Sequence, residues 1–246
     1  MASLVALLAP LDIAAPAVRT AVSRMVKQGW LQATRIAGAP GYALTPRAER
    51  RLEEAAARIY RTRSADHWDS RWHLVVPARP GDRASRERLR SGLAFLGYAQ
   101  VGDGAWVAAR PSTELAALLE AEGVHAECFA ADHESDDADL VRRAWNLDAV
   151  GRVYDRWLAE ARALVDALPA QPTDETSFAV RSRLVHEWRK FLFTDPGLPR
   201  VLLPRHWPGD VAAAFFDAQA ARLLPASARF VDHCLSLPTR GNGADR

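Results

Sequence analysis

A short basic segment near the N-terminus carries the residue types that contact phosphate groups and base edges. Residues 15–27 place cations and hydroxyl groups on one side of an expected helix. These residues are Arg19, Thr20, Ser23, Arg24 and Lys27. Arginine can form two hydrogen bonds to a guanine edge, whereas lysine acts more as a point charge on a phosphate. The segment predicts a nucleic-acid contact; the alternative is a face that is merely solvated.

The residues around this face predict a helix followed by a small hairpin. Pro16 suits a first helical position, and Gly29 suits a left-handed stop after the last periodic residue. Valines and Met25 recur at helical spacing between them and form an apolar stripe. Residues 31–36 and 42–44 are expected strands around a turn at 38–41, and Arg35 is the candidate contact on this hairpin. The apolar residues Leu4 to Leu11 predict a short helix that packs against this one. A helix pair followed by such a wing is typical of a winged helix-turn-helix, whose second helix enters the major groove.

The charge of the chain is concentrated at this end. Residues 1–63 hold ten Lys and Arg against four acids, a formal charge of +6, whereas the whole chain carries +2. A basic end on an otherwise slightly acidic chain is the electrostatic pattern expected of a module that meets phosphates.

The composition is that of an ordinary globular protein. The chain has 246 residues, of which 49% are hydrophobic and 25% charged, so one or two domains with a sizeable core are expected. Cys128 and Cys234 give no disulfide framework, which fits a cytoplasmic location. No apolar stretch is long enough to cross a bilayer, so no membrane partner is expected, and the apolar residues 3–11 are expected to belong to the fold.

The pattern of the whole chain predicts an α+β protein in three parts. Residues 1–63 form the expected winged helix, residues 64–136 a ferredoxin-like domain, and residues 137–246 a helical domain. Strands are expected at 71–76, 105–108 and 124–130. Helices are expected at 45–63, 83–98, 112–122, 139–168 with a possible break near Gly151, 178–193 and 210–224.

Several motifs along the chain together resemble one family. They are residues 18–25 (VRTAVSRM), 28–31 (QGWL), 68–72 (WDSRW), 183–191 (RLVHEWRKF), 195–199 (DPGLP), 203–204 (LP) and 207–209 (WPG). From Ser3 to about Val231 the chain resembles the PaaX family of bacterial repressors of phenylacetate degradation. The resemblance implies an N-terminal winged helix, a central dimerisation domain like the small CRISPR adaptation nuclease subunit, and a helical C-terminal domain. It also implies a homodimer on double-stranded operator DNA that phenylacetyl-CoA, or a related aryl-CoA, releases.

Two departures from the family pattern bear on DNA binding. Family members have a further helix before the N-terminal helix pair, so the first helix of the winged domain is expected to be missing from this chain. Asp12 stands where the family usually has glycine in the turn between the helices. Aspartate tolerates a left-handed backbone better than most residues, so this turn is expected to form.

A second basic set lies in the C-terminal part. Arg183, His186 and Lys190 are three and four residues apart, on one face of the expected helix. The opposite stripe is expected to be core and comprises Val180, Leu184, Trp188 and Leu192. A cationic face beside aromatic residues fits the phosphates and acyl end of a CoA thioester, and the alternative is ordinary ion pairs with Glu187 and its neighbours.

Enzyme chemistry is less well supported. The run that begins at His186 resembles a zinc-protease HExxH motif, but Lys190 replaces the second histidine. His125, Cys128, Asp132 and His133 lack metal-ligand spacing, and the strand at 74–78 lacks the carboxylate with which related nucleases hold a metal.

The sequence therefore predicts a homodimeric repressor that is not an enzyme and has neither a metal nor a cofactor. The first alternative is a truncated paralogue that dimerises and binds ligand or protein without gripping DNA. A metal-dependent nuclease is the less favoured one.

Overall fold

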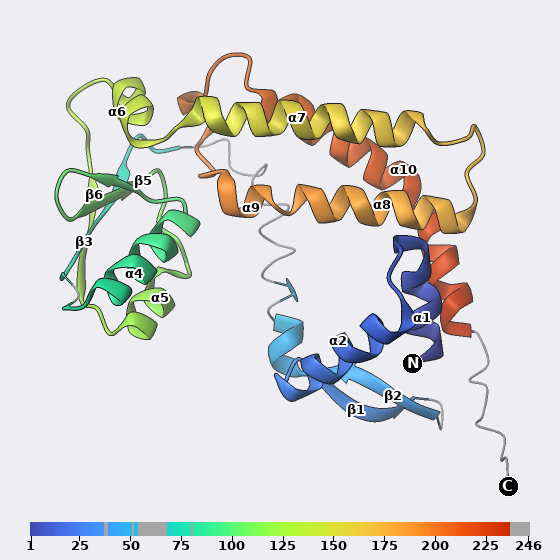
Figure 1. The fold of residues 1–246 in the computed structure, drawn as a ribbon. Helices are drawn as coiled ribbons and strands as arrows, with labels where there is room; N and C mark the ends of the chain where they lie inside the picture. Colours follow the sequence, from blue (N-terminus) through green and yellow to red (C-terminus); the bar gives the residue numbers. More distant parts are fainter. Residues whose placement is uncertain (37–38, 51, 54–67, 80, 237–246) are drawn as a thin grey trace, which may run out of the picture. The chain divides into compact units, whose positions relative to one another are not determined.

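The computed structural model describes residues 1–36, 39–50, 52–53, 68–79 and 81–236, and these form helices and small sheets (Figure 1). The predicted α+β class is confirmed. The chain divides into two compact units. The first comprises Met1–Arg58, Trp157–Trp188 and Ala212–Arg246, and the second Ile59–Arg156 and Arg189–Val211. The three domains predicted from the sequence stay predictions.

The first unit begins with two helices and a hairpin. In chain order these are α1 (Ala2–Leu8), the 3-10 helix η1 (Ala9–Leu11), α2 (Ala15–Lys27), β1 (Leu31–Ile36) and β2 (Ala39–Leu44). Strand β2 starts inside the segment predicted as a turn, because Ile36 pairs with Ala39 and Arg35 with Pro40. Residues 46–50 and 52–53 are helical, and the remainder of the helix predicted to run to residue 63 lies outside the described residues.

Helix α2 ends at the predicted glycine. Gly29 has φ +73°, its N–H donates to the Val26 carbonyl at 3.0 Å, and the Trp30 N–H donates to the Met25 carbonyl at 2.9 Å. This pair of bonds is a Schellman motif, which satisfies carbonyls that the end of a helix leaves without partners. The backbone therefore turns directly from α2 into β1.

Long helices complete the first unit. These are α8 (Asp174–Trp188), the second half of α7 (Leu147–Asp166) and most of α10 (Pro208–Ser236). Their core is aromatic: the Trp188 and Phe216 rings stack with centroids 4.7 Å apart, and Trp157 meets Trp188 edge-on at 4.8 Å. The predicted core positions Val180, Leu184 and Trp188 are buried, whereas Leu192 is half-buried and lies beyond the end of α8.

Both C-terminal helices differ from their predicted limits. Helix α8 ends at Trp188 instead of residue 193, and α10 runs on through Pro225 instead of ending at residue 224. Proline removes one helical hydrogen bond, but Leu223 and Ser227 on either side of it are buried. Packing of this stretch therefore outweighs the local cost of the proline.

The second unit contains a four-stranded antiparallel sheet. Its elements are β3 (Trp72–Pro77), α4 (Arg83–Phe95), β4 (Ala99–Val101), β5 (Ala105–Ala108), α5 (Leu115–Glu122) and β6 (Ala126–Ala131), and the strand order is β4-β5-β3-β6. This βαββαβ order is that of a ferredoxin-like fold. Val75, Leu93 and Trp106 form its core together with α4 and α5. Strand β4 was not predicted, because three residues are too few to show a period.

The helical segment after the sheet breaks at a different place from the one predicted. Helix α6 (Asp137–Ala144) and helix α7 are separated at Trp145 and Asn146, and Gly151 lies inside α7. Trp145 is extended, its ring stacks on Trp72 at 5.8 Å, and its indole N–H donates to the Gly97 carbonyl at 3.3 Å. The helix therefore stops where this packing of Trp145 begins. The short helices α9 (Phe191–Thr194) and η2 (Arg200–Leu202) follow later in the chain.

Over the described residues, no individual helix has the length and apolar character needed to cross a membrane. Only α1 with η1 and α2 taken together meet that test, and these are bent by 118° at their junction.

A partly buried polar bridge connects the sheet of the second unit to the segment just before α5. The Tyr98 hydroxyl accepts a hydrogen bond from the Ser112 N–H at 3.2 Å and lies 2.7 Å from Nδ1 of His73. Burial lowers the pKa of His73, so the neutral imidazole is favoured. The Tyr98 hydroxyl already accepts from Ser112, and donating its proton to Nδ1 of the Nε2–H tautomer completes the bridge.

This bridge predicts an acid-sensitive contribution to stability. A histidine whose pKa is lower in the folded state stabilises the fold above its unfolded pKa of about 6.5, and this contribution is lost as the pH falls below that value. His73→Asn keeps an acceptor near Nδ1 but cannot titrate. Thermal unfolding followed by circular dichroism should show a smaller loss of Tm between pH 7.5 and 5.5 for His73→Asn than for the wild type. Equal losses would contradict the bridge.

Candidate nucleic-acid interface and effector residues

The basic face predicted for α2 is present and exposed. All five of its predicted contact residues are solvent-exposed, and the sequence of α2 contains no acid. The Thr20 hydroxyl donates to the Pro16 carbonyl at 2.9 Å, so it offers a ligand only its lone pairs. Phosphate oxygens accept hydrogen bonds, and the stronger candidates for phosphate contacts are therefore Arg19, Arg24, Lys27 and Ser23.

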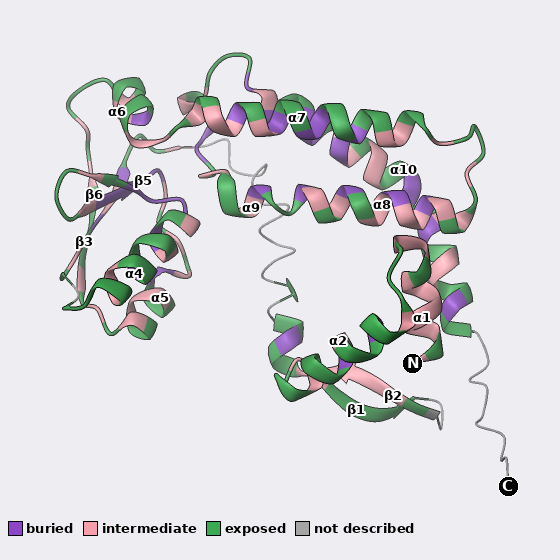
Figure 2. Cartoon of the chain, viewed as in Figure 1, coloured by how far each residue is buried: buried purple, intermediate pink, exposed green. Residues whose placement is uncertain are grey.

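The opposite side of α2 fixes the orientation of that face. Val18 and Val22 are 2% and 6% exposed, and α2 contacts both α1 and β1. In Figure 2 the exposed part of α2 is correspondingly green. Because the valines must stay buried, the cations are directed to solvent.

The hairpin is attached firmly to the end of α2. The Thr45 hydroxyl donates to the Gly29 carbonyl at 2.7 Å and accepts from the Ala48 N–H at 3.3 Å. It thereby caps the helix that begins at residue 46 and joins it to the stop after α2. Arg35, the predicted wing contact, is exposed on β1. The guanidinium of Arg47 lies over the Trp30 ring, 5.4 Å from its centroid.

The turn before α2 contains a link that the sequence did not indicate. Asp12 adopts a left-handed conformation, with φ 61°, as expected for the position where glycine is usual. Its Oδ2 accepts a hydrogen bond from Nη2 of Arg183 at 3.0 Å. One of the predicted effector residues therefore contacts the turn between α1 and α2. These two residues are 171 positions apart, and no local pattern relates them.

The predicted effector residues do not all share one helix. Arg183 and His186 lie on α8, but α8 ends at Trp188 and Lys190 is the N-cap of α9. His186 Nε2 is 3.9 Å from Glu187 Oε1, which is the neighbouring ion pair considered as the alternative. The expectation of one helical face is wrong for Lys190, and the binding role of the three residues stays a prediction.

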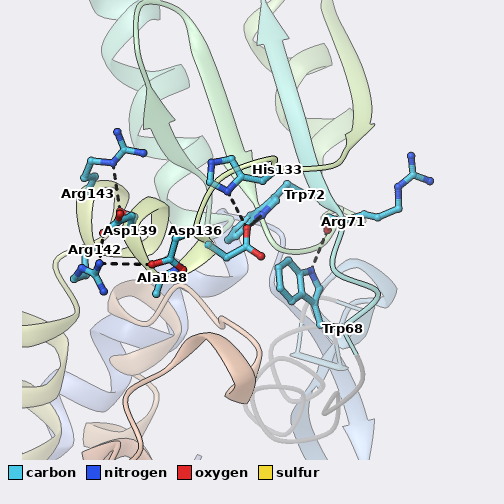
Figure 3. A network of polar contacts seen from close by, with 10 residues as sticks. Trp68, Arg71, Trp72, His133, Asp136, Ala138, Asp139, Arg142 and Arg143 are labelled. Atoms are coloured by element: carbon cyan, nitrogen blue, oxygen red, sulfur yellow. Dashed lines mark hydrogen bonds and ion pairs between the residues drawn. The ribbon is translucent and has the colours of Figure 1, made fainter.

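The second unit contains a tryptophan cluster beside a large cavity. Figure 3 shows Trp68 and Trp72 of this cluster with their polar contacts. The Trp72 indole donates to Asp137 Oδ1 at 2.8 Å, and His133 Nδ1 approaches the same oxygen at 3.0 Å. Trp68 meets Trp72 edge-on at 5.1 Å and donates to the Ala109 carbonyl. The adjoining cavity is about 1020 Å³ and is lined by three aspartates and two arginines as well as by apolar residues. Its charges are therefore of both signs.

Within the described part of the chain, no group of three or more His, Cys, Asp or Glu side chains has an arrangement that could hold a metal. His125 lies 3.1 Å from Glu127, and His133 contacts Asp137, so these histidines have partners within the fold.

Comparison with known proteins places the chain in a family. Three family models match: the PaaX-like protein over residues 1–48, the PaaX protein central Cas2-like domain over 65–141, and the PaaX-like protein C-terminal domain over 145–233. The transcriptional repressor PaaX of Escherichia coli K12 is 30% identical over 244 residues, which is 94% of this chain and 76% of that protein. An uncharacterized protein of Mycobacterium tuberculosis, Rv0674, has a solved structure that is similar with TM-score 0.60 and 25% identity, over 95% of this chain and 90% of that one. The matched segments cover most of the sequence, and the chain belongs to the PaaX family.

Proposed function

We propose that this protein is a DNA-binding transcriptional repressor of a phenylacetate-type catabolic operon. The observation that carries the proposal is the exposed, acid-free basic face of α2, next to a hairpin, in a chain whose E. coli relative is a transcriptional repressor. The helix pair and hairpin act as a winged helix-turn-helix. In such a module the second helix enters the major groove and the hairpin lies against the backbone.

The proposal includes an effector and a location. An aryl-CoA thioester, such as phenylacetyl-CoA, releases the protein from DNA by binding better to an arrangement that does not fit the operator. The protein acts in the cytoplasm, where operator DNA and thioester meet. The Arg183–Asp12 ion pair supports such a response, because it connects α8 directly to the turn that orients α2.

A homodimer is the proposed active form. The sheet of the second unit has α4 and α5 on one face, and its other face presents Val76 on β3 and Phe129 on the edge strand β6. These side chains are 41% and 49% exposed. Pairing two such faces buries both apolar groups, and a two-fold dimer presents two α2 helices to an inverted-repeat operator.

Removal of one α2 cation tests the DNA interface. Arg24→Ala should weaken operator binding by about 1–3 kcal/mol, because a base or phosphate contact is lost. Fluorescence anisotropy at fixed salt measures this change. Arg222→Ala, an exposed arginine on α10 that bonds Gln219, removes the same charge elsewhere and should leave the affinity unchanged. If the Arg24→Ala protein is folded and binds the operator normally, this face of α2 is not the DNA contact.

Variants of Arg183 and of its partner Asp12 distinguish two roles that Arg183 could have in the response to the thioester. If Arg183 contacts the thioester, Arg183→Ala should lose release by phenylacetyl-CoA, and Asp12→Asn should respond normally. If Arg183 acts through the turn, both variants should shift the thioester concentration needed for release in the same direction. Asparagine also tolerates the left-handed backbone, so Asp12→Asn removes only the charge. If phenylacetyl-CoA released both variants normally, Arg183 would have no role in the response to the thioester.

The dimer face is tested by its exposed aromatic residue. Phe129→Glu should convert the wild-type dimer to a monomer, because two carboxylates would be brought together in an apolar contact. Light scattering coupled to gel filtration measures the mass. Leu224→Glu is the matched control, because Leu224 is 48% exposed but lies on α10. A monomeric wild type, or a Phe129→Glu protein that remains dimeric, would contradict this face.

A further inference from the structure

The second unit contains a basic cavity that neither the proposed DNA contacts nor the predicted effector residues use. It is about 630 Å³ and lies between the first half of α4, the end of β3 and the β4–β5 turn. Its basic lining residues are Arg79, Arg86 and Arg90. A volume in this range accommodates a small molecule, not a macromolecular groove.

The charge of this cavity is strongly one-sided. Asp103 is the one acid among its described lining residues, against three arginines. Arg90 lies 3.9 Å from Glu87, but both side chains are well exposed, and pairs of this kind contribute little. Arg86 donates to the Gly81 carbonyl at 3.2 Å. A guanidinium has five N–H donors, so it can bond several partners at once.

Arg88, between these two on α4, shows a contrast. Arg88 points to a different partner: its Nε donates to both carboxylate oxygens of Glu122 on α5, at 3.2 and 3.0 Å. Arg86 and Arg90 are four residues apart and so lie on a common face of α4. Arg88 is thus held by Glu122, whereas Arg86 and Arg90 line the cavity.

The remaining lining residues suit a planar ring. Trp106, Leu89 and Pro77 supply an apolar surface, and Trp106 is 8% exposed. Gln100 and Asp103 add acceptors at the same cavity, and the Gln100 amide nitrogen already donates to the Gly102 carbonyl. Exocyclic amino groups of a base require such acceptors, whereas phosphates require the arginines. The cavity beside the tryptophan cluster lacks this division, because acids and arginines are mixed there.

We propose that this cavity, with Arg79, Arg86 and Arg90 around an apolar surface that includes Trp106, binds a nucleotide that carries more than one phosphate group. Two sources share this chemistry: a free nucleoside bisphosphate, and the 3′-phosphorylated ADP end of a CoA thioester. The second source rests on the proposed function, since its ligand is the proposed effector. The first goes beyond the proposed function.

Isothermal titration of the full-length protein tests the proposal with adenosine 3′,5′-bisphosphate, adenosine and phenylacetyl-CoA as probes. The bisphosphate should bind, and adenosine should bind much more weakly. Arg79→Gln and Arg90→Gln should each weaken the bisphosphate about tenfold, because each loses a charge-assisted hydrogen bond. Arg88→Gln is the matched control on the same helix and should bind the bisphosphate like the wild type.

The three probes distinguish the two sources of the ligand, and they separate failure of the cavity proposal from failure of the proposed function. If the same variants also weaken phenylacetyl-CoA, the ligand is the nucleotide end of the thioester; if they weaken the bisphosphate alone, it is a free nucleotide. Operator release by phenylacetyl-CoA is measured in parallel. If the bisphosphate does not bind, while phenylacetyl-CoA releases both the wild type and the variants from the operator, the cavity proposal is wrong and the proposed function stands. Bisphosphate binding without release would support the cavity and overturn the proposed effector. The proposal would be overturned if Arg88→Gln lost as much affinity for the bisphosphate as the two cavity variants. It would also be overturned if the cavity variants bound non-operator DNA more weakly and the bisphosphate normally.

Discussion

The burial of one side of α2 is the constraint on which the proposed DNA-binding part depends. Val18 and Val22 must face α1 and β1, and this requirement leaves Arg19, Arg24 and Lys27 facing solvent. Three cations on a helix without acids repel one another in water, and an anionic partner relieves that repulsion. The same packing that stabilises the helix therefore creates a surface for phosphates.

The glycine turn that ends α2 also fixes the position of the hairpin relative to the helix. Gly29 ends the helix in a conformation that other residues rarely adopt, and Thr45 binds its carbonyl from the far side of the hairpin. At the other end, Asp12 turns the chain into α2 and receives Arg183 from α8. Both ends of α2 are thus held by hydrogen bonds from distant parts of the chain. A change in α8 has a direct path to the orientation of the basic face, and this path gives the proposed effector response a physical basis.

The sequence predicted what local rules determine and missed what packing determines. The apolar period of residues 15–27, the stop at Gly29 and the buried stripe of Val180 and Leu184 follow from side-chain spacing and glycine chemistry, so they could be predicted. The break at Trp145 depends on a ring that stacks on Trp72, which only the folded chain brings near.

The candidate site divides in the same way. The basic face of α2 was visible in the sequence. The Arg183–Asp12 pair joins distant segments and had no sequence signal. The spacing of Arg86 and Arg90 was a signal for the basic cavity, but their convergence with Arg79 required the sheet.

The most direct test of the central claim is the fluorescence anisotropy of the purified protein on DNA from upstream of its own gene, with and without phenylacetyl-CoA. The salt concentration must be fixed, because phosphate contacts make the affinity depend steeply on it. A repressor of this kind should show tight, saturable binding that phenylacetyl-CoA releases and free CoA does not. Weak binding without sequence preference, unchanged by the thioester, would contradict the proposed function.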